Sequence, residues 1–251
     1  YHPAFGRNGN DSSPAERTTF AGRMRKYSDI IGVTLLLALV PLFVGDSAYY
    51  MRVATIALVY MSWAVAFNLI FGHTKQLFLC LNALAGAAAY VAIVLTKQFG
   101  VSPWISVWIG VATAGALGAL FSYVSVVRGL GVIFLGIITL AFTLIFHNVL
   151  LGLRELTNGE TGLVSKGLGI PLLEDARAAY YIFFGLLLVA TVVYCMLMDS
   201  RMGVAVRALS DDELTAQLSG VNVTGYKVLF AAIGSGLLGL TGAFYGFYNE
   251  I

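Results

Sequence analysis

The chain has 251 residues, of which 59% are hydrophobic and 11% charged, and its formal net charge is +2. A soluble domain carries about twice this share of charged residues, so the composition is typical of a protein that lies in lipid. The small net charge, without a basic run that has interleaved aromatic residues, argues against nucleic-acid binding. Cys80 and Cys195 both fall within apolar runs and lack the spacing of metal ligands.

Residues 1–28 are polar and rich in Ser, Arg and Gly. They lack the apolar segment of a signal peptide, and we expect a disordered tail. From residue 29 onward, most apolar runs approach or exceed the ~20 residues that a helix needs to cross a bilayer. We therefore predict an all-α, polytopic transmembrane helical bundle of about seven spans, the first short and containing Pro41. The runs are about Ile30–Val44, Met51–Phe71, Leu77–Leu95, Pro103–Val127, Leu130–Leu151, Tyr180–Met198 and Val228–Tyr248.

The distribution of Lys and Arg predicts the orientation of these spans. With the N-terminus in the cytoplasm and every run crossing, ten Lys and Arg residues lie inside and five outside. This excess fits the positive-inside rule. It places the loop 199–227 in the cytoplasm and the loop 152–179 outside.

Small residues recur at the spacing of helix contacts. In lipid, such rows let helix backbones approach closely, so we interpret them as packing seams rather than ligand sites. The rows are Ala85–Ala89, Gly110 with Ala114 and Gly118, Ser235 with Gly239, and Gly242 with Gly246.

The loop 199–227 is polar and lies between two apolar runs. Ser210 and Glu213 have the spacing of a capping box, in which each side chain accepts from the other residue's backbone N–H. Gly220 is a natural C-terminal stop, so we predict a helix of about Asp211–Ser219 with Leu214, Gln217 and Leu218 on one face. A helix this short is marginal alone in water, which suggests that it docks on another surface. An interfacial helix on lipid is the alternative from spacing alone.

Several kinds of chemistry are absent from the sequence. No Asp, Glu, Lys or Arg lies deep within the apolar runs, whereas proton-driven carriers and voltage sensors usually need such groups. The chain also lacks the G-x-x-x-x-G-K-[ST] phosphate loop, so it does not bind ATP in that manner.

The polar loop resembles that of the branched-chain amino acid ABC transporter permeases of the LivM type. The similar residues run from Gly203 through Arg207-Ala208-Leu209 and Asp211-Asp212-Glu213 to Gly220-Val221-Asn222-Val223-Thr224-Gly225-Tyr226-Lys227. Ile137–Phe142 is similar to the family's A-I-V-T-L-A-F, and Thr157–Leu163 resembles its outer T-G-G-x-x-G-L. The similarity extends from about Ile30 to the end of the chain in one register.

The resemblance implies a permease domain over residues 29–251 in the bacterial inner membrane, with 199–227 as its coupling loop. Such a subunit is no enzyme and holds no cofactor or metal. The implied partners are ABC ATPase subunits, a second homologous permease subunit, an extracytoplasmic substrate-binding protein and membrane lipid. The residues expected to dock the ATPase are Arg207, Ser210, Asp211, Asp212, Glu213, Ala216 and Gly220.

The segment after the second run departs from the family pattern. Phe78, Cys80 and Leu81 stand where the pattern has Ser, Gly and His. Bulky apolar groups there would fill space that interrupted helices use for substrate. Family members also usually continue beyond the position of Ile251, so a fragment, a degenerate paralogue and an altered substrate all remain open. Candidate residues of the translocation path are Asn68, Gln76, Phe78, Asn82 and Thr139, although the two asparagines could instead join helices.

Three hypotheses follow from the sequence. The first is the permease subunit of an ABC importer for branched-chain or related amino acids. The second is a membrane partner or scaffold that retains ATPase docking without transport. The third is an unrelated channel or secondary carrier.

Overall fold

The structure, a computed structural model, describes residues 32–42, 47–153, 157, 173 and 175–249. The chain divides into two units, residues 1–45 and 46–251. The described part of the first unit is an apolar helix, Gly32–Leu42. The polar tail predicted over residues 1–28 lies outside the described residues.

The second unit is built from helices that can cross a bilayer, which confirms the predicted polytopic helical bundle. Among the described residues, six helices are long and apolar enough to span, whereas the helix Gly32–Leu42 from the first apolar run is shorter. The six are α2 (Ala48–Phe67, continued by the π-helix η1, Asn68–Gly72), α3 (Leu81–Phe99), α4 (Pro103–Val127), α5 (Val132–Gly152), α7 (Ala176–Asp199) and α10 (Val223–Asn249).

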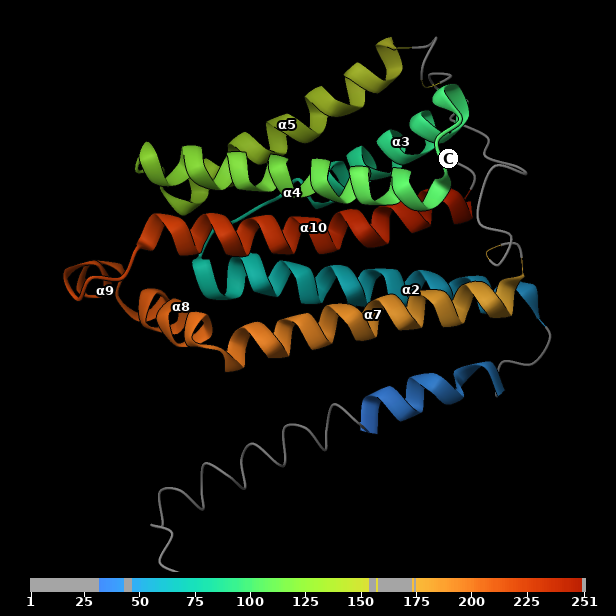
Figure 1. The fold of residues 1–251 in the computed structure, drawn as a ribbon, viewed down its shortest axis with the longest axis horizontal. Helices are drawn as coiled ribbons and strands as arrows, with labels where there is room; N and C mark the ends of the chain where they lie inside the picture. Colours follow the sequence, from blue (N-terminus) through green and yellow to red (C-terminus); the bar gives the residue numbers. More distant parts are fainter. Residues whose placement is uncertain (1–31, 43–46, 154–156, 158–172, 174, 250–251) are drawn as a thin grey trace, which may run out of the picture. The chain divides into compact units, whose positions relative to one another are not determined.

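Helix α10 is the centre of the bundle (Figure 1). It packs most extensively against α4 and α3, and on another side it contacts α2. Helix α7 packs along α2, while α5 touches α3 and α4 only lightly and leaves most of its side chains exposed. In a membrane protein, exposed apolar side chains of this kind face lipid or a neighbouring subunit.

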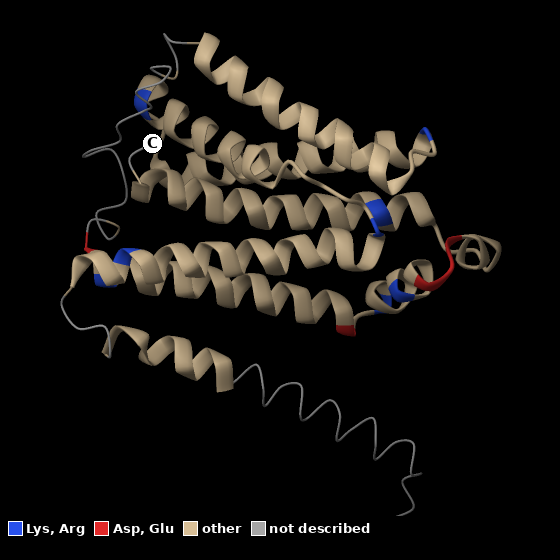
Figure 2. Ribbon diagram, turned by 180° about the vertical axis from the view of Figure 1, so that it is seen from behind, with Lys and Arg blue, Asp and Glu red and all other residues tan. Residues whose placement is uncertain are grey.

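Lys, Arg, Asp and Glu residues lie near the ends of the helices (Figure 2). The long stretches between these ends carry no Lys, Arg, Asp or Glu in the part of the chain that the structure describes. This distribution follows from the cost of placing charge in hydrocarbon.

The predicted packing seams are confirmed by the close approach of the helix backbones. A Cβ atom at Gly110 would lie 2.5 Å from the carbonyl oxygen of Ala88, and one at Gly118 would overlap the Ser235 side chain. On α10, a Cβ at Gly246 would lie 2.8 Å from the Cβ of Ala89. Only glycine fits at these contacts, so the small residues set the distances between α3, α4 and α10.

The start of the third apolar run was predicted wrongly. Helix α3 begins at Leu81, and residues 73–80, hereafter the 73–80 linker, join η1 to α3; His73 and Thr74 are still helical, whereas residues 75–80 are not. Lys75 within it has a φ of 53°, in the left-handed region. Phe78 and Cys80 are fully buried in the main hydrophobic cluster, together with Leu84 and Leu135. The apolar residues at the end of the linker are therefore core residues. Their hydrophobicity resembles that of the adjoining helix, which is why the run was predicted to begin at Leu77.

Candidate functional site

The cytoplasmic loop predicted from the sequence contains two short helices, α8 (Arg201–Asp211) and α9 (Glu213–Leu218). The predicted capping box at Ser210 is wrong, because Ser210 lies inside α8 and Asp211 is its last residue. The backbone breaks at Asp212, with φ −148° and ψ 109°, and the Asp212 carboxylate caps α9. Its Oδ1 accepts from the backbone N–H of Leu214 at 3.0 Å and of Thr215 at 3.3 Å.

The predicted stop at Gly220 is confirmed. Its φ is +85°, a conformation that glycine adopts at little cost. The Gly220 N–H donates to the Gln217 carbonyl at 3.0 Å, and the Val221 N–H donates to the Ala216 carbonyl at 3.1 Å. These two bonds form the Schellman motif, which satisfies the last carbonyls of α9.

Helix α8 is fixed to the end of α7 by a tight turn. The Ser200 hydroxyl donates to the Leu197 carbonyl at 2.6 Å and accepts from the Gly203 N–H at 3.4 Å. A Cβ at Gly203 would lie 2.6 Å from the Leu197 carbonyl oxygen, so the turn requires glycine. Nη1 of Arg207, a predicted docking residue, donates to the Met198 carbonyl at 2.9 Å. Arg207 therefore satisfies the C-terminal end of α7.

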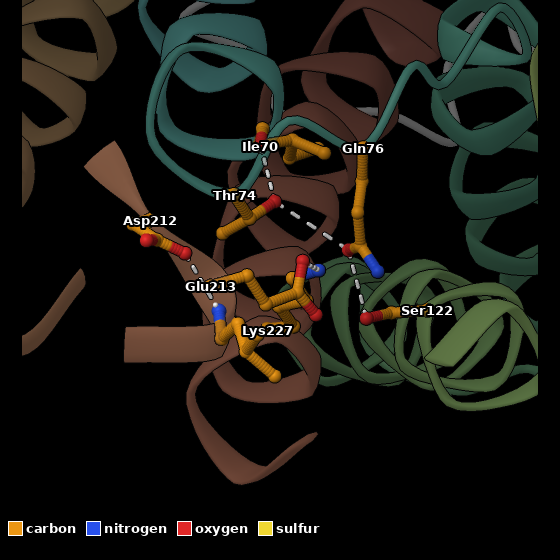
Figure 3. A network of polar contacts seen from close by, with 8 residues as sticks. Ile70, Thr74, Gln76, Ser122, Asp212, Glu213 and Lys227 are labelled. Carbon is orange, nitrogen blue, oxygen red and sulfur yellow. Dashed lines mark hydrogen bonds and ion pairs between the residues drawn. The ribbon is translucent and has the colours of Figure 1, made fainter. Parts of the chain in front are cut away.

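Helix α9 is in turn fixed to α8 and α10. Ala216, 4% exposed, packs in a small cluster with Leu209 and Val223. Nζ of Lys227 donates to Oε2 of Glu213 at 2.6 Å in an ion pair that joins the start of α10 to the start of α9 (Figure 3). The Lys227 side chain is only 12% exposed, so this pair is less screened by solvent than an ordinary surface pair.

The opposite face of α9 is exposed and partly apolar. Leu214 is 67% and Leu218 is 83% exposed, and Gln217 is exposed between them, so the face predicted from the sequence points away from the bundle. Figure 1 shows α9 beyond the end of α10, away from the sides of the spanning helices. The six-residue helix is thus held by its caps, one buried alanine and an ion pair. Its exposed leucines do not contribute to the fold of the chain.

Hydrogen bonds lower the pKa of the Asp212 carboxyl. The largest cause is the bond from the Thr215 hydroxyl, at 2.6 Å, followed by the bond from the Thr215 backbone N–H. Asp212 is therefore ionised at neutral pH, and its negative charge lies at the N-terminal end of α9, which favours negative charge.

The predicted path residues divide into two groups. Gln76, Phe78 and Thr139 are buried around the 73–80 linker. The Thr139 hydroxyl accepts from the Leu79 N–H at 3.0 Å, which ties the linker to α5. Asn68, in η1, and Asn82, near the start of α3, do not join this group.

A buried polar network at the linker was missed from the sequence. Oε1 of Gln76 accepts from the Ser122 hydroxyl of α4 at 2.8 Å, and the Thr74 hydroxyl lies 3.5 Å from the same oxygen (Figure 3). His73, at the start of the linker, hydrogen-bonds through Nε2 to the Tyr194 hydroxyl of α7 at 3.0 Å. Ser122 continues the four-residue spacing of Ala114 and Gly118 and so lies on the helix face predicted to pack. Nothing in the sequence indicated Gln76 as its partner.

The six spans, the buried small-residue seams and the lack of charge along the helices define a multi-pass membrane protein. Residues 49–251 match the model of the family described as branched-chain amino acid transport system / permease component, and the chain belongs to that family.

A curated relative is the probable branched-chain amino acid transport permease protein LivH of Methanocaldococcus jannaschii. The two are 27% identical over 179 residues, which cover 68% of this chain and 56% of that protein. The chain thus spans about half the length of this relative. No solved structure matches the chain.

Proposed function

We propose that this chain is the membrane-spanning permease subunit of an ABC importer for branched-chain or related amino acids, in a bacterial inner membrane. The observation that supports this most is the construction of α9. A six-residue helix is held by caps and an ion pair while Leu214 and Leu218 are left exposed. Two exposed leucines one turn apart, beyond the ends of the spanning helices, fit a groove on a partner protein.

The proposed partner at α9 is an ABC ATPase subunit on the cytoplasmic side. Because α9 is joined to α7 through α8 and to α10 through Lys227, a force applied to it reaches two spanning helices. We further propose a second homologous permease subunit and an extracytoplasmic substrate-binding protein, as the family resemblance implies. Assignment to the LivM type rests on the loop motif and on the similar segments Ile137–Phe142 and Thr157–Leu163.

A docking test uses the exposed leucines of α9. Replacing Leu214 and Leu218 with Asp should abolish co-purification of the ATPase, whereas Leu218→Met, which keeps an apolar surface, should not. The charge pair gives a second arm: Glu213→Lys should weaken docking, and adding Lys227→Glu should restore it by re-forming the ion pair. Equal ATPase recovery with a protein that lacks residues 212–219 would refute the proposal.

The second candidate is a partner or scaffold that retains ATPase docking without transport. It is favoured by Phe78, which is fully buried and packs edge-on against Phe121 with ring centroids 6.3 Å apart. Phe78 therefore occupies volume at the linker. Uptake of labelled leucine by vesicles that contain the complete transporter distinguishes the two, because the scaffold would give none. The family match argues against an unrelated channel or carrier.

A further inference from the structure

The 73–80 linker places non-helical backbone inside the bundle. The Leu79 N–H bonds to Thr139, which is seven residues into α5 and so roughly 10 Å along its axis. The neighbouring Phe78 and Cys80 are fully buried. Irregular backbone at such depth occurs where it is buried in protein or lines a cavity, and in transporters it often contacts substrate.

Gln76, in the middle of this linker, has a polar group without a partner. The residue is 3% exposed, and its Nε2 has no hydrogen-bond partner among the described residues. Ser122 and Thr74 both lie against its Oε1, so the two N–H bonds of the amide are the unused ones. Since the Thr74 hydroxyl already donates to the Ile70 carbonyl, it has no proton left for Gln76.

The unused groups of the Gln76 side chain are hydrogen-bond donors. The backbone N–H groups of Leu77 and Phe78 likewise have no hydrogen-bond partner among the residues that the structure describes. Lys75 is exposed and no acidic residue lies in the linker. A buried donor without a partner costs roughly 1–3 kcal/mol, so such groups usually have a ligand, a water or a functional role.

This donor set selects the chemistry of a ligand. Carboxylate oxygens accept hydrogen bonds and can use both N–H bonds of the Gln76 amide, whereas an ammonium group only donates and cannot use them. A zwitterionic amino acid carries no net charge, which suits a site without a buried cation. A dicarboxylate would bring an uncompensated negative charge.

We propose that the side-chain amide of Gln76 on the 73–80 linker, positioned by Ser122, binds the carboxylate of a monocarboxylic amino acid as it passes through the bundle. This assignment rests on the proposed function. Gln76 contacts the substrate, and Ser122 is a positioning residue that keeps the amide oxygen turned away from it.

The test uses the complete transporter, with its ATPases, second permease and binding protein, in lipid vesicles. Uptake of labelled leucine and labelled alanine is measured beside ATP hydrolysis, which reports assembly. Gln76→Leu should lower uptake of both amino acids by roughly 10- to 100-fold, the loss expected for a hydrogen bond to a charged group. Both should fall alike because they share the carboxylate, and ATP hydrolysis should remain within about twofold.

Gln76→Glu distinguishes a carboxylate site from an ammonium site and from a structural water. The added negative charge should lower uptake below that of Gln76→Leu, since it repels the carboxylate. If Gln76 bound an ammonium group, Gln76→Glu would instead transport better than Gln76→Leu. If Gln76 held only a structural water, uptake by Gln76→Glu would be neither lower nor higher than uptake by Gln76→Leu, and ATP hydrolysis would fall with uptake. Each of these two results overturns the proposal.

Matched serines on α4 test the positioning role. Ser122 and Ser106 are both 0% exposed, but only Ser122 contacts Gln76. Ser122→Ala should reduce uptake several-fold, whereas Ser106→Ala should leave uptake unchanged. Combining Ser122→Ala with the polar change Gln76→Asn should lower uptake by clearly less than the sum of the two separate effects. Equal effects of the two serine changes would refute positioning. A wild-type transporter that assembles but takes up neither amino acid would refute the proposed function itself.

Discussion

Replacing Gly242 with Ala should separate α10 from α3. A Cβ at Gly242 would lie 2.7 Å from both the Cα and the Cβ of Ala85 and would overlap the Ala85 carbonyl oxygen. Backbone atoms of a packed helix cannot move aside as a flexible side chain can. Overpacking of this kind costs about 1–3 kcal/mol.

The same helix supplies a control. A Cβ at Gly236 would meet only Val111 Cγ1, at 3.8 Å, which is an ordinary contact. Both changes bring the same gain in helix propensity, about 1 kcal/mol. The difference in stability between the two variants therefore isolates the steric effect.

Thermal unfolding of the two purified variants in one detergent provides the measurement. At roughly 2–4 °C per kcal/mol for a chain of this size, Gly242→Ala should melt about 2–12 °C below Gly236→Ala. Equal melting temperatures, or a higher one for Gly242→Ala, would show that the two helices separate freely and that the seam does not determine their distance.

Further predictions concern the loop, the linker and the orientation. Asp212→Ala should speed amide hydrogen exchange throughout α9, while Ser210→Ala should leave it nearly unchanged. The pKa of Asp212 is lowered in the folded state, so its capping contribution is complete above the unfolded-state pKa of about 3.9 and is lost as pH falls through the folded-state pKa. Exchange protection of α9 should therefore hold from pH 7 to 5 and decline below about pH 4. Phe78→Ala should lower the free energy of unfolding by about 3–5 kcal/mol through the cavity that it leaves, as a denaturant or thermal titration would show. Single cysteines at Ser219 and Ser102, in a background without other cysteines, should label from opposite sides of the membrane, and labelling from one side would rule out the proposed topology.

The spanning helices could be predicted because their length and apolarity are properties of a local stretch of sequence. The linker could not, since the run from Leu77 to Cys80 is as apolar as the helix that follows. A buried extended segment and a buried helix have the same composition and differ only in their neighbours. Here the neighbour is Thr139, which is 60 residues away and bonds to the Leu79 N–H.

The capping residue of α9 was misassigned for a similar reason. Ser210 and Asp212 are both good N-cap residues, so local preference does not choose between them. The choice is made by α8, whose buried Val206 and Leu209 and whose Arg207 bond to α7 extend the helix through Ser210. Gly220 was predicted correctly because a positive φ depends on the residue itself.

The predicted orientation of the spans depends on the first apolar run. Half of the ten residues counted inside lie before residue 28, and they count there only if this run crosses the membrane. Without its crossing, the five tail charges lie at the other end of the six spans, and the count becomes five against ten. The charge count therefore favours opposite orientations in the two cases, and the cysteine labelling tests the sidedness directly.

The seam between α4 and α10 has a mechanical consequence. Gly115 lies against the Ala232 carbonyl and Gly239 lies against Ala114, so no large side chain of either helix interlocks with the other at these points. Resistance to sliding there comes from backbone contacts that repeat every four residues, roughly 6 Å along the axis. Because the Ser235 side chain of α10 lies over Gly118 on the same seam, a lengthwise shift of one such step would carry it from a glycine onto a residue that has a side chain, Ala114 or Ser122.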